Sequence, residues 1–86
     1  MPHFVYIVKC NNNSYYTGIC FNLKSRIKAH NDGKYKGSFT KGRLPVKLVY
    51  WEKSANKYEA AKREKVIKDS SRIKKEILIR SLLRTK

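Results

Sequence analysis

Five side chains spread along this sequence are of types that together could cleave a phosphodiester bond. They are two tyrosines, an arginine, a histidine and a glutamate: Tyr6, Tyr16, Arg26, His30 and Glu64. Such cleavage requires an activated water, relief of the charge that develops on the phosphate, and stabilisation of the leaving oxygen. Each residue also has an ordinary structural explanation, so the prediction depends on how the fold arranges them.

The net charge indicates a polyanionic partner. Lysine and arginine number 21 against 6 aspartates and glutamates, a formal net charge of +15 at pH 7 for 86 residues. Nucleic acid is the first candidate, because each phosphate that the protein neutralises releases counterions. An anionic membrane surface is the second, but no lipidation signal or long apolar run supports it. The N-terminus leads directly into a strand-like segment and not a signal peptide, so we expect a cytoplasmic protein.

The two cysteines are predicted to be buried thiols. Cys10 and Cys20 form neither a CxxC motif nor a zinc-binding pattern. Both lie in strand-like segments, where cysteine commonly packs as a small apolar residue. A disulfide between them is the less favoured alternative.

The sequence pattern predicts the element order β-β-α-β-α-α. Runs of β-branched and aromatic residues predict strands at 5–10, 15–20 and 46–51. Helices are predicted at about 23–31, 55–68 and 72–83, with candidate caps at Asn22, Ser54 and residues 69–71. These elements indicate an α+β fold, a small three-stranded mixed or antiparallel sheet flanked by helices, in a single domain spanning residues 1–86.

Between the first helix and the third strand, residues 33–45 predict a basic loop. The segment holds three of the four glycines and one of the two prolines. We expect four of its side chains to follow a nucleic-acid backbone without recognising bases: Lys34, Lys36, Lys41 and Arg43. Tyr35, in the same loop, is a further candidate for contact with nucleic acid.

The first predicted helix places an arginine and a histidine on its inward face. At about 100° per residue, Arg26 and His30 fall within the same third of the circumference as Leu23 and Ile27. A guanidinium at the edge of an apolar face suits a phosphate, because its planar fork binds two oxygens at once. The structural alternative is that Arg26 packs its stem and extends its charge to solvent, while His30 is a half-buried hydrogen-bonded residue.

The second long helix places a carboxylate on its inward stripe. Glu64 lies among Ala60, Ala61 and Ile67. Burying a carboxylate is costly unless a cation compensates its charge. One carboxylate together with phosphate oxygens and waters is a common Mg²⁺ arrangement. The alternative is an internal ion pair between Glu64 and Arg26 or a lysine.

Strand alternation constrains the two tyrosines. If the first hairpin had a two-residue turn, Lys9 would face Tyr16 and Tyr6 would face Ile19, which places the tyrosines on opposite faces. A shared site therefore requires a longer loop, a bulge or a position at the edge of the sheet, and we predict one of these. Gly18 in the second strand would let another group approach closely.

Several remaining apolar residues are expected to serve packing. Tyr50 and Trp51 are expected to pack on the sheet or at its edge. The apolar residues of the last helix are expected to pack in the small core: Ile73, Ile77, Leu78 and Leu82.

As a set, these motifs resemble the GIY-YIG nuclease superfamily. The resemblance covers about residues 3–80 and is carried by Phe4-Val5-Tyr6, Tyr16-Thr17-Gly18, Arg26, His30 and Glu64. The sequence is most similar to the short stand-alone bacterial members. Phe4 stands where the name-giving glycine would be, and Thr17 stands where isoleucine would be. Neither position is expected to do chemistry.

The resemblance implies a DNA endonuclease that depends on a divalent metal, Mg²⁺ or Mn²⁺, and on no organic cofactor. In this scheme Tyr6 is the general base or positions the water, and His30 holds Tyr6 or relays its proton. Arg26 stabilises the transition state at the phosphate, Tyr16 binds a phosphate oxygen or orients the water, and Glu64 binds the metal. The chain has no room for a DNA-recognition domain, so branched, damaged or single-stranded DNA, and RNA, stay open as substrates.

Two other functions fit the same charge. One is a non-catalytic basic DNA- or RNA-binding module that retains the fold, and the other is a ribosome-associated protein. Glu64 discriminates the binding module from the nuclease, because a pure binder gains nothing from a carboxylate that faces its polyanion. Co-sedimentation with ribosomes or a preference for RNA over DNA would identify the ribosome-associated protein.

Overall fold

The computed structural model describes residues 3–32 and 44–84, with side chains to residue 82. Its elements follow the predicted order: β1 (His3–Lys9), β2 (Tyr15–Cys20), α1 (Leu23–Asn31), β3 (Lys47–Ser54), α2 (Lys57–Lys68) and α3 (Arg72–Arg84). The predicted contacts of Lys34, Tyr35, Lys36, Lys41 and Arg43 with nucleic acid fall outside the described residues. No helix within the described ranges is long and apolar enough to span a membrane.

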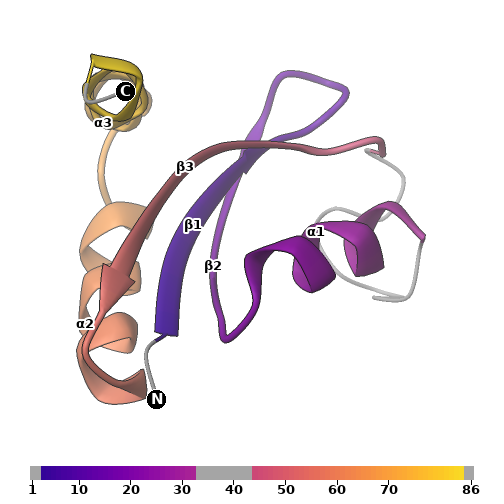
Figure 1. The fold of residues 1–86 in the computed structure, drawn as a ribbon. Coiled ribbons are helices and arrows are strands. Elements are labelled where there is room, and N and C mark those ends of the chain that lie inside the picture. The colour runs from indigo at the N-terminus through magenta and orange to yellow at the C-terminus, as the bar shows by residue number, and fades with distance from the viewer. Residues whose placement is uncertain (1–2, 33–43, 85–86) are drawn as a thin grey trace.

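The three strands form one antiparallel sheet in the order β2-β1-β3, with β1 in the centre. Helix α1 lies on one face of this sheet, and α2 and α3 lie on the other (Figure 1). The predicted α+β architecture is therefore confirmed, and the sheet is antiparallel throughout.

The loop of the β1–β2 hairpin has three residues, 11–13. The Cys10 N–H donates to the Ser14 carbonyl at 2.8 Å, and the Asn13 N–H donates to the Cys10 carbonyl at 2.9 Å. Asn13 has a φ of 68°, in the left-handed region that asparagine tolerates. With this odd-numbered loop, Tyr6 lies opposite Gly18 and Tyr16 lies opposite Val8. Because directly opposed residues share a face, both tyrosines project from the same side of the sheet. Of the three predicted alternatives, the longer loop is the one that the structure has.

Both faces of β1 are covered, which explains why Val5, Tyr6, Ile7 and Val8 have no exposed surface. The core on the α2 and α3 side consists of Val5, Ile7, Tyr50, Ala60 and Ile67. The core on the α1 side consists of Tyr6, Val8, Cys10, Cys20 and Val46. Both cysteines are buried free thiols, as predicted.

Strand β3 and the start of α2 differ from the prediction. The strand continues to Ser54, because β1 begins at His3 and the two residues pair. Ser54 is therefore not the helix cap, and α2 does not begin at Ala55. Asn56 is the cap instead, and its side chain accepts a hydrogen bond from the Glu59 N–H at 2.9 Å.

The apolar residues of α3 do not all pack in the core. Leu78 and Leu82 contact the core on the α2 side. Ile73 and Ile77 are 70% and 56% exposed, so the expectation that they pack was wrong. The reason is that α3 lies against the sheet along one narrow stripe, and these two isoleucines stand outside it.

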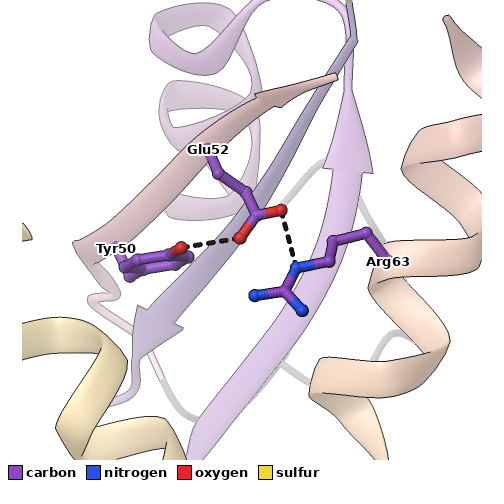
Figure 2. A network of polar contacts seen from close by, with 3 residues as sticks. All are labelled: Tyr50, Glu52 and Arg63. Carbon is purple, nitrogen blue, oxygen red and sulfur yellow. Dashed lines mark hydrogen bonds and ion pairs between the residues drawn. The ribbon is translucent and has the colours of Figure 1, made fainter. Parts of the chain in front are cut away.

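A polar network joins β3 to α2. The Tyr50 hydroxyl donates to one oxygen of Glu52 at 2.6 Å, and Arg63 Nε donates to the other at 2.8 Å (Figure 2). Burial, and then the hydrogen bond and charge of Glu52, raise the pKa of Tyr50 to about 12. Glu52 thus accepts hydrogen bonds from a phenol on its own strand and from a guanidinium on the neighbouring helix.

We expect Tyr50→Phe to lower the free energy of unfolding by about 1–2 kcal/mol, because it removes a partly buried hydrogen bond to a charged group. The measurement is chemical denaturation at neutral pH. Tyr58→Phe is the matched control, since Tyr58 is 68% exposed and its variant should change stability by less than about 0.5 kcal/mol. Equal effects of the two substitutions would contradict the role of the network.

Candidate active site

A buried tyrosine–histidine pair lies at the centre of the α1-covered face. The Tyr6 hydroxyl is 3.1 Å from His30 Nε2, and His30 is only 3% exposed. Helix α1 follows β2 after a two-residue connection, and Asn22 caps it by accepting from the Ser25 N–H at 3.0 Å. This start sets the helix phase that turns His30, in the last turn, toward β1.

Tyr16 completes an aromatic cluster with this pair. Its ring centroid lies 5.6 Å from that of His30 and 6.4 Å from that of Tyr6, and the Tyr6 and His30 centroids are 6.3 Å apart. Tyr16 is half-buried, whereas Tyr6 is fully enclosed. Among the three rings, Tyr16 is therefore the one with access to solvent.

Gly18 makes this arrangement possible. A Cβ at this position would lie 2.7 Å from Tyr6 Oη, 2.9 Å from Tyr6 Cζ and 3.1 Å from Tyr16 Cε2. The two tyrosine rings occupy the space that a side chain would need. The sequence predicted that Gly18 lets another group approach the strand closely, and the groups that do so are the Tyr6 and Tyr16 rings.

Arg26 provides positive charge beside the cluster. It lies one turn before His30 on α1 and is half-buried. Burial first, and the Arg26 charge second, lower the pKa of His30, so its imidazole is neutral at neutral pH. Burial raises the pKa of the Cys20 thiol, and Arg26 partly opposes that shift. Two groups on different elements thus experience the Arg26 charge.

Glu64 lies on a different element from the other four candidate residues. It is half-buried on α2, between the buried Ala60 and Ile67, and α2 packs on the sheet face opposite Tyr6. Within the described residues it forms no hydrogen bond or ion pair, so the alternative pairing with Arg26 or a lysine is not found there.

The donors present fit a divalent metal ion that shares its coordination with the substrate. The described ranges contain no group of three or more His, Cys, Asp or Glu side chains that could hold a metal by themselves. Magnesium is commonly bound through one or two carboxylates with waters and substrate phosphate oxygens. Glu64, whose carboxylate forms no hydrogen bond or ion pair in those ranges, suits this type of site.

Asn31 is a supporting residue that the sequence analysis missed. Its side-chain amide donates to the Val46 carbonyl at 3.2 Å, and its amide oxygen accepts from the Val46 N–H at 2.7 Å. This two-way pairing fixes the end of α1, next to His30, against the residue that precedes β3. In the sequence, an asparagine at a helix end indicates only a cap, so no local signal identified this long-range contact.

The fold and this cluster place the chain among nuclease-type domains. The family model of the GIY-YIG catalytic domain matches residues 2–76, and the chain belongs to this family. GIY-YIG domains act on nucleic acid, and the nucleases among them generally depend on a metal ion.

Within the family, the chain is similar to UPF0213 proteins. One from Clostridium perfringens is 52% identical over 79 residues, which cover 92% of this chain and 84% of that protein. YazA of Bacillus subtilis is 46% identical over 77 residues, with 90% and 77% covered. The solution NMR structure of a UPF0213 protein from Bacillus halodurans matches with a TM-score of 0.58 and 42% identity, over 92% of this chain and 83% of that one.

We expect Gly18→Ala to lower the free energy of unfolding by about 1–3 kcal/mol, because the added methyl group overlaps the Tyr6 ring. The sharper test repeats the substitution in a Tyr6→Phe background, which removes the nearest atom, Tyr6 Oη. Chemical denaturation of the four proteins gives the coupling between the two positions. An unchanged cost of Gly18→Ala in the Tyr6→Phe background would contradict the close approach.

The lowered pKa of His30 also predicts a pH dependence of stability. As the pH falls below 6.5, the ordinary pKa of histidine, His30 becomes protonated in the unfolded chain at a higher pH than in the folded protein. The free energy of unfolding should therefore fall as the pH drops from about 6.5 toward the lower folded-state pKa, and the His30 contribution should be constant above that window. His30→Gln should show a shallower fall over the same range in pH-dependent denaturation. Parallel curves for the two proteins would refute the assignment.

Proposed function

We propose that residues 1–86 form a single-domain, metal-dependent endonuclease that hydrolyses phosphodiester bonds of DNA. The observation that carries the proposal is the buried hydrogen bond of 3.1 Å between Tyr6 and His30, with Tyr16 and Arg26 beside it. A net charge of +15 supplies attraction for the polyanion. Membership of the GIY-YIG family supports the reaction type.

The half-buried residues would meet the phosphate first. Arg26 presents a permanently charged fork that binds two phosphate oxygens and stabilises the charge that develops as water attacks. Tyr16 presents a phenol next to it, which binds a phosphate oxygen or orients the attacking water. Tyr6 and His30 lie behind these two groups.

The neutral imidazole gives Tyr6 a way to act as a base without first becoming a phenolate. In the tautomer with hydrogen on Nδ1, His30 Nε2 accepts the Tyr6 hydrogen bond. As the Tyr6 oxygen takes a proton from water, its own proton moves to Nε2, and the hydroxide attacks phosphorus. This relay avoids the cost of ionising a phenol whose reference pKa is near 10.

The burial of Tyr6 requires that water reach its hydroxyl when the substrate binds. Tyr6 has no exposed surface in the protein without ligand. Catalytic contacts often tighten only in the complex with substrate, and local rearrangement on binding is common in enzymes. The half-buried Tyr16 is the neighbouring side chain whose displacement would admit the water.

Glu64 would hold the metal, with the remaining positions taken by waters and phosphate oxygens. Helix α2 packs on the other face of the sheet but contacts β2, the edge strand that carries Tyr16, so the ion would lie at that edge and share the phosphate with Tyr16 and Arg26. The ion, Mg²⁺ or Mn²⁺, would polarise the phosphate and stabilise the leaving oxygen. The structure leaves the Glu64 carboxylate unengaged within the described residues, in keeping with this role.

The proposal predicts metal-dependent cutting of DNA that two single substitutions abolish. Plasmid, branched and single-stranded DNA are incubated with the protein in Mg²⁺ or Mn²⁺, and separately with a chelator. Tyr6→Phe removes the proton acceptor and Glu64→Gln removes the metal ligand, so each should lower the cleavage rate by about a hundredfold or more.

Matched controls come from neighbouring positions. Tyr15→Phe alters the tyrosine that precedes Tyr16. The Tyr15 side chain packs on the α2 and α3 face of the sheet, away from Tyr6. Glu59→Gln alters an exposed acid on the same helix as Glu64, which pairs with Lys62 at 3.9 Å. Both controls should retain cleavage.

Cutting that persists in both Tyr6→Phe and Glu64→Gln would overturn these roles. DNA binding without metal-dependent cutting, unchanged or strengthened by Glu64→Ala, would indicate the non-catalytic binding module.

A further inference from the structure

A pair of aromatic side chains stands beside Tyr6 on the same face of the sheet. Trp51 on β3 lies directly opposite Tyr6, and Phe4 precedes Tyr6 by two residues on β1. The Phe4 and Trp51 rings meet edge to face, with centroids 5.9 Å apart and planes at 73°. Directly opposed residues have Cβ atoms about 4.5–5.5 Å apart, so this aromatic pair adjoins the candidate active site.

The pair is accessible to a ligand. Trp51 is 37% exposed and Phe4 is half-buried. Within the described residues, β3 pairs only with β1, so its other edge is not covered by a strand. The indole packs against the Phe4 ring, and the two rings form an apolar surface next to the buried Tyr6–His30 pair.

A positive charge adjoins this surface. Lys53 lies directly opposite Phe4 and is exposed, so it projects from the same face as Phe4 and Trp51. An aromatic surface with a neighbouring lysine is the combination that binds unpaired nucleotides, because the base stacks on the ring and the cation contacts the phosphate. In a fully paired duplex the faces of the bases are occupied by neighbouring bases, so an indole cannot stack on them.

We propose that Phe4 and Trp51 form a stacking site for an unpaired base of the nucleic-acid substrate, one strand away from Tyr6. The inference deepens the proposed function and rests on it for the identity of the ligand. The site makes single-stranded nucleic acid, or a strand with an unpaired nucleotide beside the cut, a better substrate than continuous duplex. Trp51 is then a specificity-determining residue, and Tyr6, Tyr16 and Arg26 act on the adjoining phosphate.

The chain contains one tryptophan, so its fluorescence reports on this position alone. The protein is titrated in chelator, without cleavage, with a single-stranded oligonucleotide and with the blunt duplex of the same sequence. We expect the single strand to quench the fluorescence strongly and the duplex to quench it weakly. Equal quenching by both forms at saturation would overturn the stacking site.

Affinity measurements on variants complete the test, with the anisotropy of a labelled oligonucleotide as the readout. Trp51→Leu keeps an apolar side chain but removes the ring, and it should weaken single-strand binding by about tenfold while changing duplex binding little. Trp51→Phe retains a ring and should preserve most of the affinity. Tyr58→Ala removes an exposed aromatic from α2, on the other side of the sheet, and should have no effect.

The outcomes separate this proposal from the proposed function. Single-strand quenching with a specific loss of affinity in Trp51→Leu supports the stacking site even if no cleavage occurs in Mg²⁺ or Mn²⁺. Metal-dependent cleavage with unchanged single-strand affinity in Trp51→Leu overturns the stacking site and leaves the nuclease assignment intact. Circular dichroism shows whether each variant is folded. The comparison of Trp51→Leu with Trp51→Phe, both of which keep an apolar side chain, isolates the contribution of the aromatic ring to single-strand affinity.

Discussion

In the β1–β2 hairpin, the three-residue loop 11–13 decides which side chains meet. Because the loop has an odd number of residues, Tyr6 lies opposite Gly18, and Tyr16 projects from the same face. A shift of the register by one residue would move every side chain of one strand to the other face. The left-handed Asn13 and the hydrogen bonds that close the loop are therefore as important to the candidate site as the tyrosines themselves.

The same register gives the sheet two different faces. One packs against α2 and α3, and the other carries the candidate site under α1. The odd-numbered residues of β1 pack against α2 and α3, and the even-numbered ones turn toward α1. This separation allows one small protein to bury a phenol and an imidazole without weakening its main core. Gly18 completes the division, because its missing side chain leaves room for both tyrosine rings.

Charge and burial together set the state of the cluster. The enclosed His30 is held neutral by burial and by the nearby Arg26, whereas Arg26 and Tyr16 retain access to solvent. A ligand that approaches the cluster from solvent would therefore encounter a cation and a phenol before the buried Tyr6 and His30. The polar network of Glu52 lies on the opposite face, where it joins β3 to α2 and takes no part in this cluster.

Periodicity and composition in the sequence determined the element order, the antiparallel or mixed sheet, and the inward position of Arg26 and His30. Strand alternation also showed that a shared tyrosine site excludes a regular two-residue hairpin. These features follow from local patterns and from steric rules that act over a few residues. Only the tertiary structure decided the register, the capping of α2 by Asn56, the exposure of Ile73 and Ile77, and the hydrogen-bonded pairing of Asn31 with Val46. It also placed the helix that carries Glu64 on the other face of the sheet from Tyr6, and Trp51 beside Tyr6, because both positions depend on which elements pack together and not on spacing along the chain.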